Sequence, residues 1–196
     1  LGGFFMHSRV GLATAYLSDE WFQCVDACVD EARKLSMEAW LYDEDRWPSG
    51  AGGGLVTKNP KYRMRMLVAT ELSSPSDLKW ESDVLAAFTA KIDEGAANDV
   101  QRLVRGKPAP RLGRGERILV FSVAMQPPNS WYNGFAYLDT LNNEAVAKFI
   151  EVTHEAYLER YGKDFGKVIP GIFTDEPNHG GFSLPSEGTL SVPWTG

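Results

Sequence analysis

The sequence is poor in cysteine and histidine and contains no long apolar run. Its 196 residues include two cysteines and three histidines. No apolar run approaches the roughly 20 residues that a membrane-spanning helix needs, so we expect no membrane-embedded segment. Lys and Arg total 20 against 26 Asp and Glu, a net charge of −6. No basic face is therefore available to neutralise phosphates, which excludes nucleic acid as a favoured partner.

The two cysteines favour neither a disulfide nor a redox role. Cys24 and Cys28 lie four residues apart on an expected helix, where side-chain directions do not suit a disulfide. We interpret them as small buried apolar side chains in a reduced compartment such as the cytoplasm. The sequence begins with Leu1 rather than Met, so we expect the true N-terminus to be missing, which leaves secretion open.

The overall composition is that of one folded domain. Apolar residues make up 43% and charged residues 23% of the chain, close to the globular average. Aromatic residues reach 12% and include six Trp. Flat aromatic faces are well suited to stacking on sugars, so this content hints at a carbohydrate ligand.

The first 42 residues predict a parallel βαβ unit. An apolar strand is expected over residues 2–7 and a second one over 37–42. Ser18 is placed to cap a helix over 19–36, in which apolar residues recur every three or four positions. Strand, helix and strand in this order are typical of parallel α/β folds.

The βα pattern is interrupted and then resumes. Residues 58–115 are expected to form an inserted, β-rich, antiparallel excursion, because helical periodicity is mostly absent there. A strand over 118–125, a helix over 143–161 and a strand over 168–173 follow. Charged and aromatic residues come directly after each predicted strand, as they do at the mouth of a TIM barrel. The sequence therefore predicts an α/β fold, a partial (β/α)₈ TIM barrel comprising about the first four βα units within residues 1–196.

Acidic residues at two of the strand ends are candidates for acid and base chemistry. Glycoside hydrolysis needs two carboxyl groups, one protonated and one ionised, on either side of the scissile bond. Asp175 and Glu176 follow one strand, and Pro177 restricts Glu176 to an extended conformation. Three consecutive acids, Asp43 to Asp45, follow another strand. Helix capping or pairing with Arg46 would explain these acids equally well.

Several segments together resemble the catalytic barrel of large bacterial glycoside hydrolases related to the family 106 α-L-rhamnosidases. The two acidic motifs are specific in combination, and the resemblance covers most of the chain outside 73–115. The segments that carry it are GGFFMH (2–7), YLSDEWF (16–22), WLYDEDRWPSG (40–50), WYNG (131–134), YLDTLN (137–142), THEAY (153–157) and GIFTDEP (171–177).

The resemblance implies a TIM barrel, a plant or microbial glycan as substrate, and catalysis by carboxylates, with calcium near the site. Glu176 is then the favoured proton-handling residue, and Glu44 is a candidate for the second catalytic carboxyl. Sugar contacts are expected from further strand-end residues. These are His7, Arg9, Asp43, Asp45, Trp47, Trp131, Tyr132, Asn133, Asp175, Asn178 and His179.

Two other functions fit the same residues. One is a truncated, non-catalytic carbohydrate-binding fragment, and the other is a metal-assisted hydrolase with acidic oxygen ligands at the strand ends. The zinc-protease motif is excluded because position 158 is Leu rather than a second histidine after His154. Because half a barrel exposes sheet edges, we also expect this chain to pair with the remainder of a longer chain or to self-associate.

Overall fold

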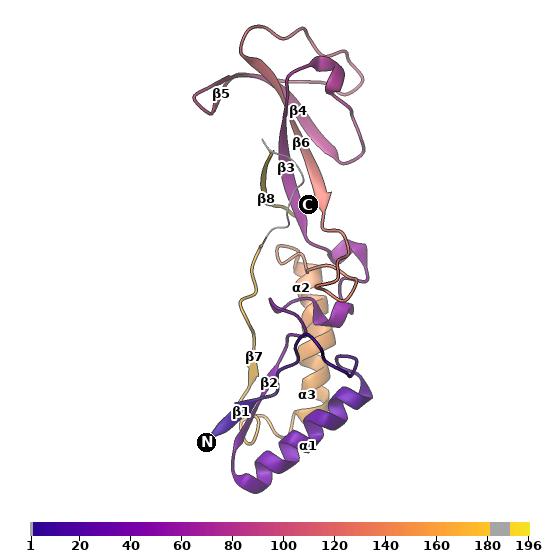
Figure 1. The fold of residues 1–196 in the computed structure, drawn as a ribbon, viewed down its shortest axis with the longest axis vertical. Helices are drawn as coiled ribbons and strands as arrows, with labels where there is room; N and C mark the ends of the chain where they lie inside the picture. The colour runs from indigo at the N-terminus through magenta and orange to yellow at the C-terminus, as the bar shows by residue number, and fades with distance from the viewer. Residues whose placement is uncertain (1, 181–188) are drawn as a thin grey trace. The chain divides into compact units, whose positions relative to one another are not determined.

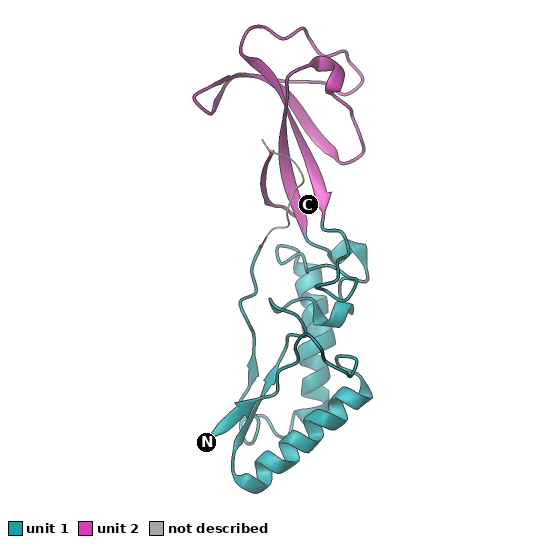
Figure 2. Cartoon of the chain, viewed as in Figure 1, with its two compact units in different colours: residues 1–64, 126–179 teal, residues 65–125, 180–196 magenta. Residues whose placement is uncertain are grey.

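A computed structural model describes residues 2–180 and 189–196, which belong to two compact units (Figure 2). The first unit comprises residues 1–64 and 126–179, and the second comprises 65–125 and 180–196. From the sequence, the inserted β-rich excursion is expected over residues 58–115. Each unit has a sheet of its own.

The first unit is built on a short parallel sheet (Figure 1). Strand β1 (Gly3–Phe5) leads through helix α1 (Asp19–Leu35) to strand β2 (Glu38–Tyr42), and β7 (Ile172–Phe173) pairs with the other side of β2. Both pairings are parallel. The predicted βαβ unit is confirmed, and so is the Ser18 cap, whose hydroxyl accepts a hydrogen bond from the Trp21 backbone N–H.

The second helical segment runs over the predicted residues but contains an irregular turn. Helix α2 (Asn143–Ile150) is capped by the Asn142 side chain and continues into a π-helical turn, η4 (Glu151–Glu155), and then into α3 (Ala156–Tyr161). Such π turns are rare and occur frequently at functional sites. Here the turn carries His154, which faces the site described below.

Helices α1 and α3 cover one face of the parallel sheet. Alternate strand residues point into the shared core, whose buried members include Trp21, Val29, Leu41 and Tyr157. The opposite face carries aromatic rings from all three strands, and Phe5 packs against Trp40, Tyr42 and Phe173. Phe5 is 52% exposed and Phe173 40% exposed, so this aromatic face is partly open to solvent among the described residues.

The prediction that Cys24 and Cys28 are buried is wrong. Both cysteines are free and exposed. The buried stripe of α1 consists of Trp21, Val25, Val29 and Ala32. Each cysteine stands one position before a member of this stripe, which rotates it by about 100° around the helix and out of the core.

The second unit is a five-stranded antiparallel sheet in the order β5-β4-β6-β3-β8. Among the described residues are three short 3₁₀ turns: Gly52–Gly54 and Pro60–Tyr62 belong to the first unit, and Pro75–Asp77 belongs to the second. The strands are β3 (Arg65–Leu72), β4 (Val84–Asp93), β5 (Ala96–Arg102), β6 (Glu116–Met125) and β8 (Thr189–Pro193).

The predicted partial TIM barrel is wrong. The parallel sheet of the described residues has three strands, and the apolar run predicted as a barrel strand over 118–125 lies instead in β6. Strand β6 pairs antiparallel with both β3 and β4. An apolar run shows that a strand is buried but does not reveal its neighbours, and here the neighbours come from the segment expected to be an excursion.

The sequence predicts no membrane-spanning segment. In the part of the chain that the structure describes, no helix is both long and apolar enough to cross a membrane. Helix α1 has 17 residues and exposes charged side chains along one side.

Candidate functional site

The carboxyl ends of the three parallel strands bring His7, Glu44 and Asp175 together. His7 follows β1, and its Nε2 lies 3.1 Å from Glu44 Oε1 beyond the end of β2. The His7 ring stacks on Tyr42 with centroids 3.7 Å apart, and the Tyr42 hydroxyl donates to Asp175 Oδ2 at 2.7 Å. Ligand sites of parallel α/β sheets lie outside the carboxyl ends of their strands, which is the position of this cluster.

Glu44 is a buried acid whose proton is held near neutral pH. Its side chain is 1% exposed, and its Oε2 atom has no hydrogen-bond partner. Burial, reinforced by the negative charge of Asp175, raises the pKa of Glu44 to about 7, although the Arg9 cation opposes the shift. Burial also lowers the pKa of His7. Glu44 can therefore hold a transferable proton near neutral pH.

The raised pKa predicts that Glu44 destabilises the fold as pH rises. The folded state retains a proton that the unfolded state loses near pH 4.5, so the free energy of unfolding falls between about pH 4.5 and 7. With solvent screening allowed for, we expect a loss on the order of 2 kcal/mol. Urea denaturation of wild type and Glu44→Gln at pH 5 and pH 8 measures this.

The lowered pKa of His7 acts in the opposite direction, because a histidine that is neutral when folded stabilises the fold more as pH rises. The comparison with Glu44→Gln separates the two contributions. The variant should gain stability relative to wild type at pH 8 but not at pH 5. An equal difference at both pH values would contradict the assigned shift.

The acids on either side of Glu44 are also buried. Asp43 is 0% exposed, and its Oδ2 accepts from the Thr174 hydroxyl at 2.7 Å and lies 3.2 Å from His154 Nε2. Asp45 is 2% exposed and accepts from the Gly53 backbone N–H at 2.8 Å. Burial raises the pKa of Asp45. Buried acids are rare unless paired, so three in succession mark this strand end as a functional candidate.

Ser49 joins the loop after β2 to the loop after β7 through hydrogen bonds. The Ser49 backbone N–H donates to the Asp175 carbonyl at 2.9 Å, and the Asp175 backbone N–H donates to Ser49 Oγ at 2.9 Å. The buried Tyr137 hydroxyl donates to the Ser49 carbonyl at 2.8 Å. These bonds fix Asp175 relative to Glu44 without using either carboxylate.

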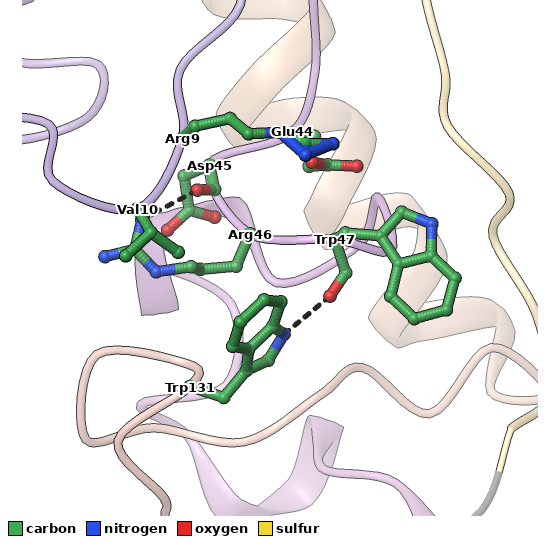
Figure 3. Close-up of a pocket in the computed structure, with 7 residues that line it drawn as sticks. All are labelled: Arg9, Val10, Glu44, Asp45, Arg46, Trp47 and Trp131. Carbon is green, nitrogen blue, oxygen red and sulfur yellow. Dashed lines mark hydrogen bonds between the residues drawn. The ribbon is translucent and has the colours of Figure 1, made fainter.

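Two tryptophans lie beside Glu44 at the surface (Figure 3). The Trp131 indole N–H donates to the Trp47 carbonyl at 2.7 Å. The Trp47 indole N–H donates to Glu176 Oε2 at 3.1 Å. Trp47 is 42% and Trp131 48% exposed, and both line a small pocket together with Arg9 and Glu44. Glu176 is exposed, and its positive φ of 42° lies in the left-handed region, so the extended conformation expected before Pro177 is wrong. Of the two predicted catalytic residues, only Glu44 is thus buried.

The remaining residues predicted to contact a sugar differ in how far their side chains already interact within the protein. The Asn133 amide donates to Asp45 at 2.8 Å and accepts from Arg46 at 2.7 Å, so it joins two loops. Tyr132 is half-buried and stacks on Tyr137, and burial raises its pKa to about 12. Arg9 is exposed near Glu44.

Asn178 and His179 lie at a different pocket from Glu44, together with Asp43. The Asn178 amide donates to the Glu176 carbonyl at 3.0 Å, and His179 Nδ1 lies 2.9 Å from the Thr140 hydroxyl. The strand-end residues predicted to share one cleft therefore do not do so: Glu44 lines one pocket, Asn133 another, and Asn178 with His179 a further one.

Sequence reasoning missed three residues that organise the site. The sequence identified Tyr42 only as the end of a strand, assigned no role to Ser49, and excluded His154 from a zinc-protease motif. One signal was available for Tyr42, because the last residue of a parallel strand commonly borders the site at that edge. Nothing in the sequence indicates that Ser49 or His154 contacts the strand ends.

The resemblance implied calcium near the site, and calcium takes six to eight oxygen ligands, several of them carboxylates. Within residues 2–180 and 189–196, no group of three or more His, Cys, Asp and Glu side chains is arranged to hold a metal ion. Calcium near the site stays a prediction made from the sequence.

Comparisons with protein-family models, with curated proteins and with solved structures give no match. The function is accordingly argued from the geometry of the strand-end site. The resemblance to family 106-like glycoside hydrolases stays a prediction made from the sequence.

Proposed function

We propose that the strand-end site hydrolyses a glycosidic bond, with Glu44 as the carboxyl that supplies the proton. The observation that carries this proposal is the buried Glu44, whose pKa is raised to about 7 beside Asp175. A glycosidase needs one carboxyl that is protonated at neutral pH and one that is ionised. Burial favours Glu44 over the exposed Glu176 for the first role.

In the proposed reaction, Glu44 donates its proton to the leaving oxygen as the bond from the sugar carbon to that oxygen breaks. Asp175 supplies the second carboxylate, held by the Tyr42 hydroxyl at 2.7 Å and by its backbone bonds to Ser49. Its negative charge stabilises the positive charge that develops on the sugar. Water completes the hydrolysis, and Glu44 regains a proton.

The exposed tryptophans support a carbohydrate as the substrate. Trp47 and Trp131 flank the Glu44 pocket, and their faces offer stacking surfaces for sugar rings. The same observation favours a second candidate function, a carbohydrate-binding fragment without catalysis. An α-L-rhamnoside is the first substrate to test, because the sequence resembles rhamnosidases.

Hydrolysis of a panel of aryl glycosides, with α-L-rhamnosides included, tests the proposal. We expect turnover that declines above about pH 7, as Glu44 ionises. Glu31→Gln, an exposed acid on α1, is the matched control and should behave as wild type. Saccharide binding without any turnover would instead establish the binding-fragment alternative.

Asp175→Asn should shift the pH dependence in a defined direction. Asparagine can still accept from the Tyr42 hydroxyl but carries no charge, so the pKa of Glu44 should fall. The decline in turnover should therefore begin at a lower pH than in wild type, together with a lower maximal rate. An unchanged pH midpoint would show that the charge of Asp175 does not affect the pKa of the acid that titrates.

A further inference from the structure

A second pocket of the first unit lies on the Asp43 side of the strand end. It has a volume of 370 Å³ and shares no lining residue with the Glu44 pocket. Leu138 and three residues of α2, Val146, Phe149 and Ile150, give it an apolar wall. Its polar residues include Asp43, His154 and His179. Nothing in the proposed reaction uses these groups.

Asp43 lines this pocket and has one carboxylate oxygen that makes no hydrogen bond. Its Oδ2 atom is occupied by the Thr174 hydroxyl and by His154 Nε2. Its Oδ1 atom is buried and has no hydrogen-bond partner. Buried carboxylate oxygens are nearly always paired, so an unpaired one beside a cavity points to a missing donor.

His154 lies between Asp43 and Thr153 beside this pocket. Its Nε2 atom is 3.2 Å from Asp43 Oδ2, and its Nδ1 atom is 3.0 Å from the Thr153 hydroxyl. The Thr153 hydroxyl donates to the Phe149 carbonyl at 2.5 Å, so its oxygen can only accept from His154 Nδ1. The His154 ring is therefore held against Asp43 Oδ2 and leaves Asp43 Oδ1 without a partner.

His179 presents an acceptor at the same pocket. The Thr140 hydroxyl donates to the Asn178 carbonyl at 2.9 Å, so its oxygen accepts from His179 Nδ1, which lies 2.9 Å away. When His179 is neutral, this leaves Nε2 as a free acceptor. Asp43 Oδ1, which has no partner, and the ring of His179 therefore accompany an apolar wall.

We propose that this pocket is a second saccharide subsite, in which hydroxyl groups donate to Asp43 and His179 while an apolar sugar face packs on α2. A sugar matches both parts of this lining, with hydroxyl donors for the acceptors and an apolar ring face for the wall. This inference rests on the proposed function, because it extends the same substrate class to a pocket that does not contain Glu44.

The three histidines of the sequence allow a direct test by NMR. His7 reports on the Glu44 site, whereas His154 and His179 report on the second pocket. The chain is labelled with ¹⁵N-histidine and titrated with methyl α-L-rhamnoside and methyl α-D-glucoside to about 100 mM, which detects millimolar binding. We expect at least one glycoside to shift the ring signals of His154 and His179 in a saturable manner.

His179→Ala should weaken that titration, read at His154, by about five- to tenfold, the value of one hydrogen bond. It changes an exposed side chain, so the fold should be retained. Glu151→Gln, an exposed residue of the same π turn, is the matched control and should leave binding unchanged.

The outcomes separate the subsite from the proposed reaction. Glycoside shifts confined to His7 would overturn the subsite and leave the reaction standing. Shifts at His154 and His179 in a chain without hydrolytic activity would do the reverse. Saturable shifts with n-propylamine, but with no glycoside, would overturn the choice of a sugar.

Discussion

Glu44→Gln should lower the turnover of glycosides that have poor leaving groups by 10²-fold or more, about the contribution of one general acid. Glutamine retains the shape of the side chain and its reach to His7, but it has no proton to transfer. Aryl glycosides with activated leaving groups need less protonation and should lose less. The decline in activity near pH 7 should also disappear in the variant.

Glu176→Gln decides between the two predicted catalytic carboxyls. Glu176 is exposed, and its Oε2 accepts from the Trp47 indole, a bond that the glutamine amide oxygen can preserve. If Glu44 is the acid, Glu176→Gln should retain the pH dependence and show similar, modest losses for both classes of leaving group. If Glu176→Gln, and not Glu44→Gln, caused a large loss of turnover only for glycosides with poor leaving groups, the general acid would be Glu176.

The sequence predicted the local elements of the first unit well. Helix α1 was placed almost to the residue, because Ser18 caps it and its apolar residues keep one helical period. The acids after β2 and β7 were selected because parallel strands end at one edge of a sheet. These features depend on residues close together in the chain, which one sequence can reveal.

The features that the sequence did not predict depend on contacts between distant residues. The sequence of β6 is typical of a buried parallel strand, and only its pairing with β3 and β4 shows that it belongs to an antiparallel sheet. Glu44 and Glu176 both follow strands, and only the packing around Glu44 distinguishes them by burial. The partnership of Asp43 with His154 spans more than a hundred residues and has no local signature.

Gly54→Ala should destabilise the first unit by roughly 3 kcal/mol, because the new methyl group has no room. A Cβ at Gly54 would clash with the Phe135 ring. Phe135 closes the loop that carries Trp131 and Asn133, and the Phe135 backbone exchanges two hydrogen bonds within that loop. The substitution should therefore displace the loop and weaken saccharide binding at the Glu44 pocket as well as stability.

Gly134→Ala is the matched comparison for that effect. Gly54 and Gly134 have nearly equal positive φ angles, 83° and 80°, but a Cβ at Gly134 meets nothing within 4 Å. Gly134→Ala should lose only the conformational preference for glycine, about 1 kcal/mol. Urea denaturation followed by tryptophan fluorescence measures both variants. Equal losses would show that backbone conformation, rather than the close approach of Gly54 to Phe135, fixes this loop beside the site.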